Sequence, residues 1–524
     1  MAEAGQRGLA RLLGGFGAAS SAAAWLLLAA YVFPLVYGVL LYRPGLRLPF
    51  SLSWAVAWTL LQAAVSAGLS VAAGWPLGVL AGFYGSRAAR AAVLLSLAPF
   101  MSPVVVVALG FRAAYLDTPL SFLARGWSGV VALHSYYNIG LAAVLTAAAA
   151  GEAEASIVEA ARLNGLRGPR LWFRVLLPLT SRAAVHAWVL AFLYSATSAA
   201  PLLVEGAAYR YYTLEAWLYT LYTGFPELMG SVMLLAVGEV AAAGLLGLLY
   251  SRLSPGSRGA APVALRGSAL IPLRGWWRLP ALAYTLAVIV YLYAPIAGVA
   301  VNAVGASLGE LERFAARGPG LAGAVANSIL YASVTAAAAL PLGLAAAVRA
   351  GLGAASLSAV AVAPVAYGVA ATLVYYDRLA PILGARAASM LLILLAHQAA
   401  ALPLASRSLE AGVRRIPGEA LDHMALLGLR GGRLLPHLAA MLRGHAAAAA
   451  GLAAAASLGE FGATIVVSVP ETWSLTVLVY QMMGSGRLFH EACLAALMLE
   501  AFSASSLAVA AAALTRLPRG GAAG

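Results

Sequence analysis

The residues of this chain that could do chemistry lie inside long apolar segments. Glu460 stands in one of them beside Gly459 and Gly462, and His134 and His397 stand in two others. A carboxylate inside a membrane span costs at least ~2.5 kcal/mol, so it usually faces a cavity or a partner. We therefore expect Glu460 either to line a pathway or to accept hydrogen bonds at a helix break. The two histidines are also pathway candidates, although a lone histidine in a span more often packs as a satisfied core residue.

Two further carboxyl groups occupy matching places in the last apolar segment of each half of the chain. These are Glu239 and Glu500, and we expect them to have a structural pairing role. The alternative is a proton relay, but no series of further acidic residues along the spans accompanies these two glutamates.

The remaining reactive groups exclude most covalent chemistry. The chain contains arginine but no lysine, so it has neither a GxxxxGK[ST] phosphate-binding loop nor a Schiff-base lysine. Its single cysteine, Cys493, excludes an internal disulfide and a multi-cysteine metal site. No spacing of histidines and carboxylates assembles three metal ligands. We therefore expect no catalytic residue, no metal and no cofactor, and little supports a membrane-embedded enzyme.

The amino-acid composition is that of a membrane protein rather than of a soluble one. Of the 524 residues, 62% are hydrophobic and 10% are charged, against roughly 45–50% and about 25% in soluble domains. This balance excludes an ordinary soluble enzyme, a disordered chain and a coiled coil. A net charge of +14 would suggest nucleic acid as the partner of a soluble protein. Here we expect the arginines to report membrane topology and expect no nucleic acid to bind.

Twelve apolar segments are long enough to cross a lipid bilayer, which takes about 20 residues. The sequence therefore predicts an all-α polytopic membrane protein with about twelve transmembrane helices. The expected spans are Ser20–Tyr42, Trp54–Gly82, Ala91–Phe111, Gly126–Ala150, Ala183–Val204, Leu228–Tyr250, Ala281–Val304, Val325–Val348, Ala355–Tyr376, Ala387–Ser406, Gly444–Val469 and Ala492–Thr515.

The arginines gather in three long connections, Arg162–Arg182, Arg252–Arg278 and Arg407–Arg443. With the N-terminus inside, all three fall on the cytoplasmic side, as the positive-inside rule requires. We therefore expect a multi-pass protein of the cell membrane with both termini in the cytoplasm.

The two halves of the chain resemble each other at an offset near 263 residues. His134 matches His397, and the tetrapeptide Gly-Leu-Arg-Gly occurs at 165–168 and again at 428–431. Because six spans is an even number, the repeats share one orientation and are related by an axis along the membrane normal. We predict two parallel six-helix repeats, 1–262 and 263–524, with the pathway between them. An irregular linker near Ser251–Leu279 would join them.

The connection before the fifth span has the form of a docking element rather than a catalytic one. Ser156 and Glu159 are spaced as a capping box, which would start a short helix. Gly165 would end that helix with a left-handed turn. Small residues after Glu159 would let another backbone approach closely, and Pro178 would break the chain again ahead of the span.

This connection resembles the permease subunits of ATP-binding-cassette (ABC) importers that depend on a substrate-binding protein. Their signature is Glu-Ala-Ala, three residues, Gly, nine residues, then Ile-x-Leu-Pro. It is matched in register, with Val175 in place of Ile, by Glu159, Ala160, Ala161, Gly165, Leu177 and Pro178. In the second half Gly428 aligns with Gly165, but Asp422-His-Met replaces Glu-Ala-Ala and Met441 replaces the proline.

A second segment, Ser457–Thr464, resembles the Ser-Leu-Gly-Glu-Phe-Gly-Ala-Thr segment of permeases for ferric iron, thiamine, molybdate and sulfate. Fused twelve-span permeases of about this length are typical of the ferric-iron and thiamine branches. The resemblance therefore implies ferric iron or thiamine as the substrate.

The resemblance also implies a type I permease fold with coupling loops at 152–182 and 407–443, the second including Asp422 and Gly428. Each loop would contact a cytoplasmic ABC ATPase subunit, so two copies would bind and would hydrolyse ATP in place of this chain. An extracytoplasmic substrate-binding protein would deliver the solute. The alternative hypothesis is a secondary transporter with two parallel six-span halves, driven by an ion gradient through a membrane-buried ion or proton site.

Overall fold

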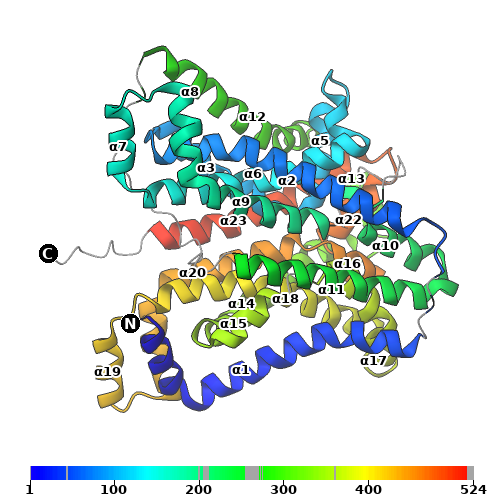
Figure 1. The fold of residues 1–524 in the computed structure, drawn as a ribbon. Coiled ribbons are helices and arrows are strands. Elements are labelled where there is room, and N and C mark those ends of the chain that lie inside the picture. The colour runs from blue at the N-terminus through cyan, green and yellow to red at the C-terminus, as the bar shows by residue number, and fades with distance from the viewer. Residues whose placement is uncertain are drawn as a thin grey trace. The chain divides into compact units, whose positions relative to one another are not determined.

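The computed structural model describes residues 2–42, 45, 47–198, 201–203, 212–253, 271, 273, 275–358 and 362–515. Within these ranges the regular structure is helical and contains no strand (Figure 1). Most of the expected linker and the proposed repeat boundary at 262/263 lie outside the described residues, as does the end of the expected fifth span at Val204.

Ten helices in the described part are long and apolar enough to cross a membrane, which confirms an all-α, multi-pass membrane protein. Helices are the spanning elements because their backbone hydrogen bonds are satisfied internally. The ten helices are α1 (Ala2–Leu41), α2 (Leu52–Gly82), α6 (Gly126–Glu152), α9 (Leu177–Ala196), α11 (Met229–Leu253), α12 (Arg278–Ala303), α14 (Gly320–Val348), α18 (Ala385–Val413), α20 (Leu435–Gly459) and α23 (Phe489–Thr515).

Shorter helices connect these spans. They are α3 (Arg87–Leu95), α4 (Leu97–Met101), α5 (Val104–Tyr115), α7 (Ala155–Leu163), α8 (Gly168–Leu171), α10 (Leu214–Gly224), α13 (Leu308–Ala315), α15 (Ala350–Ser358), α16 (Pro364–Ala371), α17 (Asp377–Leu383), α19 (Gly418–Leu426), α21 (Gly462–Val467) and α22 (Leu475–Met483).

The third and ninth expected spans are not single helices. The third bends by 110° between α4 and α5, where Ser102 and Pro103 have extended backbone. The ninth is interrupted at Ala363, just before Pro364, and α16 then continues through the π-helical turn η8 (Thr372–Tyr376) into α17. A proline disfavours helical backbone in the preceding residue, which explains both breaks.

Other boundaries also differ from the expected ones. The first helix begins near residue 2 rather than at Ser20 and contains a kink at Gly14. The helix expected from Ala183 begins at 168, because α8, the π-helical turn η2 (Trp172–Leu176) and α9 follow one another without a gap. Pro178 lies in the first turn of α9, where its missing N–H is tolerated, so the expected break at this proline is wrong.

The chain forms two compact units that do not follow its two halves. One unit contains Pro49–Ala216 and Leu245–Val304, so α12 packs with first-half helices, chiefly α5. The other contains Met1–Leu48, Trp217–Gly244 and Gly305–Gly524, so α1 packs against α14, α16 and α18. The first span of each half therefore belongs to the unit built mostly from the other half.

Small residues set the close approach of helices within each unit. A Cβ atom on Gly78 of α2 would lie 2.6 Å from the Ala143 carbonyl oxygen of α6, and one on Gly451 of α20 would lie 2.5 Å from the Ser506 carbonyl oxygen of α23. Helix association in lipid depends on such van der Waals contact, because lipid chains are as apolar as the side chains.

Candidate functional site

The helix α7 displays the first two residues of the Glu-Ala-Ala motif on its exposed face. Glu159 and Ala160 are exposed, whereas Ala161 is half-buried. On the opposite face Val158 is fully buried and packs with a cluster that includes Val79 and Phe83. The helix is therefore fixed to α2 through one face and is free to meet a partner with the other.

The start and end of α7 are set by different residues than the spacing suggested. Its N-cap is Glu154, without a side-chain hydrogen bond, so Ser156 lies inside the first turn and the expected capping box does not form. The end agrees with expectation, since Gly165 has φ 79°. The Leu166 amide donates to the Ala161 carbonyl (3.1 Å), which closes a Schellman-type turn.

The helix α19 repeats this geometry 263 residues later. Its ends at 418 and 426 correspond to 155 and 163 in α7, and Gly428 has φ 68°. The Leu429 amide donates to the Met424 carbonyl (2.9 Å), the counterpart of the Leu166 bond. The loops share a second positive-φ glycine, Gly168 (53°) and Gly431 (57°). The second loop keeps the backbone of the first although Asp422-His-Met replaces Glu-Ala-Ala.

Both helices present an apolar side chain to solvent at their last residue. Leu163 is 88% exposed and its counterpart Leu426 is 84% exposed. The acidic residues Glu159 and Asp422 occupy equivalent exposed positions. Large apolar side chains exposed together with charged groups are typical of surfaces that bind another protein.

Two pairs of arginines, which were not among the residues predicted from the sequence, complete the match. Arg167 corresponds to Arg430 and Arg170 to Arg433, and all four side chains are exposed. The fixed offset of 263 residues is the signal that would have found them. Each loop therefore offers an acidic residue, a leucine and two arginines on one backbone scaffold.

The remaining residues of the motif lie elsewhere. Leu177 is half-buried and Pro178 is exposed, and both belong to the first turn of α9 rather than to α7. Met441, the counterpart of Pro178, lies inside α20. These positions therefore support the span that follows each loop.

Aromatic side chains hold the base of the first loop. The Trp172 indole N–H donates to the Tyr84 hydroxyl (2.6 Å), and the Trp75 indole N–H donates to the Thr180 hydroxyl (2.8 Å). The two indole rings meet edge to face, with centroids 5.4 Å apart. Burial raises the pKa of Tyr84, so this phenol stays neutral and available to accept the hydrogen bond.

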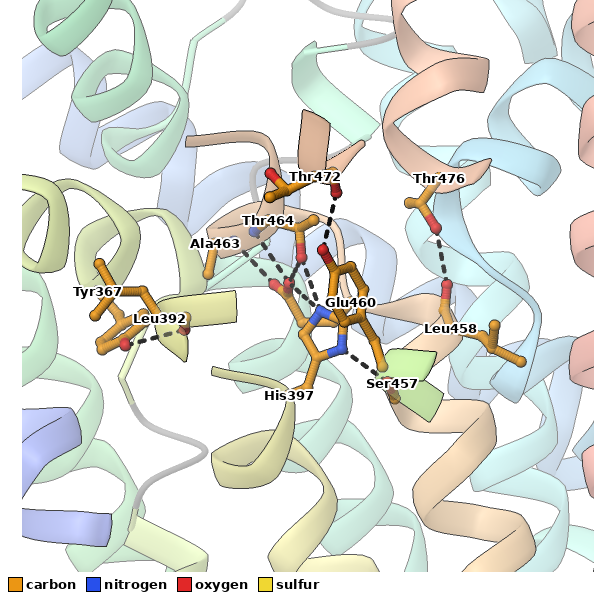
Figure 2. Close-up of polar contacts among 11 residues, drawn as sticks. Tyr367, Leu392, His397, Ser457, Leu458, Glu460, Ala463, Thr464, Thr472 and Thr476 are labelled. Atoms are coloured by element: carbon orange, nitrogen blue, oxygen red, sulfur yellow. Dashed lines mark hydrogen bonds and ion pairs between the residues drawn. The ribbon is translucent and has the colours of Figure 1, made fainter. Parts of the chain in front are cut away.

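The second candidate site is a buried polar cluster around Glu460, directly after α20 (Figure 2). One carboxylate oxygen accepts from the Ala463 amide (2.8 Å), and the other accepts from the Thr464 amide (3.1 Å) and the Thr464 hydroxyl. Glu460 thereby caps the first turn of α21. Of the two roles expected for this residue, these bonds favour hydrogen bonding at a helix break.

His397 of α18 joins the same cluster (Figure 2). Its Nδ1 lies 2.7 Å from the Ser457 hydroxyl oxygen, and its Nε2 lies 2.9 Å from the Thr464 hydroxyl oxygen and 3.5 Å from a Glu460 oxygen. Both ring nitrogens are thus engaged, as expected of a satisfied core histidine. The network fixes the broken end of α20 to α18, and a pathway role for either residue stays a prediction.

In the first half the matching helix ends at the equivalent position, but no carboxylate follows it there. The helix α9 ends at Ala196, which is 263 residues before the end of α20 at Gly459. Thr197 follows there in place of Glu460. His134, the counterpart of His397, is buried in α6, where its ring interacts with the Val130 carbonyl one turn before it. His134 therefore belongs to one compact unit, whereas His397 and Glu460 belong to the other.

Glu239 is also buried, in α11. Neither of its carboxylate oxygens has a hydrogen-bond partner within the described residues, and the structural pairing role expected for Glu239 and Glu500 stays a prediction. No group of three histidine, cysteine or acidic side chains that could hold a metal occurs among the described residues.

Comparison with protein-family models and with curated protein sequences finds no match for this chain.

Proposed function

We propose that the chain is the transmembrane permease subunit of an ABC importer, and that α7 and α19 are the docking helices for two cytoplasmic ATPase subunits. The observation that carries this proposal is the duplicated exposed helix, with matched ends, matched positive-φ glycines and matched exposed leucines. A transport protein with two motor subunits needs two such surfaces. The Glu-Ala-Ala motif in the first loop supports the same role.

In this proposal the chain crosses the membrane twelve times in two parallel six-helix repeats. The ten long helices supply ten spans, and the two proline-broken segments supply the third and the ninth. Both loops and both termini lie in the cytoplasm of a cell-membrane protein, in agreement with the positive-inside rule. An extracytoplasmic binding protein delivers the solute to the opposite side.

Mechanical coupling follows from the two faces of each docking helix. The exposed face binds the ATPase, and the buried face transmits its movement to the spans through Val158 in the first loop and Leu421 in the second. ATP binding and hydrolysis bring the ATPase subunits together and apart, and their different contacts in the two states shift the spans between inward-open and outward-open arrangements. The permease performs no covalent step.

The substrate is proposed from the Ser457–Thr464 segment, which favours ferric iron or thiamine. Because the Glu460 carboxylate is occupied by the α21 amides and Thr464, this segment supports the proposal as a structural signature rather than as a binding site. Uptake of each solute into vesicles, with its binding protein added outside, distinguishes the two.

One observation favours the alternative, an ion-driven secondary transporter. Glu239 is a buried carboxyl group in a membrane helix and has no hydrogen-bond partner within the described residues. Such a group could carry a proton. The alternative has no use for two exposed docking helices, which is why we favour the permease.

Thiol labelling tests the docking surface directly. Leu163→Cys and Leu426→Cys, each in a Cys493→Ala background, are expected to react with a membrane-impermeant maleimide in inside-out vesicles and to be protected by bound ATPase. Leu308→Cys, on the exposed face of α13, is the matched control and is expected to react only from the other side. Labelling of either loop from the exterior, or ATP-independent uptake by the double variant Leu163→Asp/Leu426→Asp, contradicts the proposal.

A further inference from the structure

The two loops have the same backbone conformation, but different side chains pack beneath them. The aromatic pair under the first loop, Trp75 and Trp172, has no aromatic counterpart in the second half. Leu340 stands at the position equivalent to Trp75 and Leu435 at that equivalent to Trp172, and Arg443 replaces Thr180. The hydrogen bonds that fix the first loop to α2 therefore cannot form in the second.

The N-terminal segment of α1 occupies this place instead. Leu9, Leu12 and Leu13 lie on one face of the helix and are buried in a cluster with Leu421 and Met424 of α19. The same cluster contains Leu434, from the turn η9 (Gly431–Leu434), and Leu438 of α20. Figure 1 shows the N-terminal end of α1 beside α19.

A break in α1 separates this segment from the membrane span. Gly14 has φ 51° and ψ −129°, a conformation that residues with a Cβ atom rarely adopt. The helix therefore changes direction just after Leu13. Before the break, the Gln6 side-chain amide donates to the Ala347 carbonyl at the end of α14 (3.2 Å). This hydrogen bond fixes the segment to α14 as well as to α19. We call residues 2–13 the N-terminal arm.

We propose that the N-terminal arm is the brace of the second docking helix: it holds α19 in position, whereas α7 is held by the aromatic pair of its own half. The proposal deepens the proposed function, because it makes the start of the chain part of one of the two ATPase docking surfaces. It also explains how α19 keeps the backbone of α7 without the supporting side chains of the first loop.

The position of α19 should therefore depend on the arm, and that of α7 should not. Met424 is 8% exposed on the face of α19 that meets the arm, and Val158 is fully buried on the corresponding face of α7. Met424→Cys and Val158→Cys, each in the Cys493→Ala background, report local opening through their rate of reaction with a maleimide. Both are measured in the full-length protein.

Removal of two arm side chains is the decisive change. In Leu9→Ala/Leu13→Ala we expect the maleimide reaction at Met424→Cys to accelerate at least about tenfold, equivalent to 1.4 kcal/mol of easier opening, and that at Val158→Cys to change less than about twofold. Arg11→Ala, an exposed position on the same arm, is the matched control and should change neither rate. Trp172→Leu should give the reverse pattern.

Three outcomes decide the matter. An unchanged rate at Met424→Cys in the arm variant overturns the proposal. Equal acceleration at both reporters also overturns it, because the arm would then support the whole protein rather than α19. Acceleration confined to Met424→Cys supports it, whether or not an ATPase binds. Failure of the ATPase to protect Leu163→Cys and Leu426→Cys would instead count against the proposed function.

Discussion

The substitution Glu460→Gln separates the two roles of this residue. In the protein, two backbone amides, the Thr464 hydroxyl and the His397 ring converge on the Glu460 carboxylate. Glutamine keeps one acceptor oxygen and turns the other into a donor, which faces another donor. Loss of a hydrogen bond to a charged group costs about 1.5–3 kcal/mol, and a buried unpaired donor adds about 1–3 kcal/mol. The lower ends of these two ranges together give a destabilisation of about 3 kcal/mol.

Thermal unfolding can be followed through Cys493, the single cysteine, which is buried in the same compact unit. A thiol-reactive fluorogenic dye reacts with it when the unit opens. For a unit of this size we expect roughly 1–2 °C per kcal/mol, so Glu460→Gln should lower Tm by roughly 3–6 °C. Glu310→Gln, which removes an exposed carboxylate of α13, should change Tm by less than about 1 °C.

The refuting result combines two measurements. If Glu460→Gln unfolds at the same temperature as the unchanged protein but no longer transports, then the carboxylate acts on the solute and the structural assignment is wrong. A lowered Tm with transport retained below that temperature would confirm the assignment.

Three further changes test the assignments, and two of them have a matched control position. Gly165→Ala should strain the turn after α7 by about 1–2 kcal/mol and reduce ATP-dependent uptake, whereas Gly151→Ala, without a positive φ, should not; equal uptake by both would contradict the docking geometry. Glu239→Gln should leave ATP-dependent uptake unchanged. Complete loss of uptake in this variant would favour proton coupling. Gly78→Ala should lower Tm because its Cβ would overlap α6, while Gly68→Ala has free space; similar Tm values would count against the α2–α6 packing.

Much of the fold could be predicted because length and apolarity are enough to identify a span. The ten long helices overlap ten expected segments, although α20 lies nearer the N-terminus than the expected span Gly444–Val469. The two proline breaks could not be predicted from apolarity, because a continuous helix and a bent helix both give an apolar segment of the same length. The packing of α1 and α12 with the opposite half was also hidden, since a helix that is apolar all round carries no pattern that points to one neighbour.

The candidate sites differ in how far the sequence reveals them. The backbone of the two loops around α7 and α19 was predictable, because glycines at fixed spacing impose the same turn despite the change from Glu159 to Asp422. The cluster around Glu460 was only half visible. Its helix-capping bonds are local, but His397 lies 63 residues away in the sequence, and nothing except the folded packing of α18 against α20 brings the two together.

The exchanged first helices restrict how the polypeptide can be divided. If the chain is cut between residues 253 and 275, the N-terminal fragment contains α1 but not α12, and the C-terminal fragment contains α12 but not α1. Each fragment would expose the apolar surface against which a helix of the other fragment normally packs. The fragments should consequently be degraded when made singly and rescued when made together, so that a gene split at this point would still encode an obligate heterodimer.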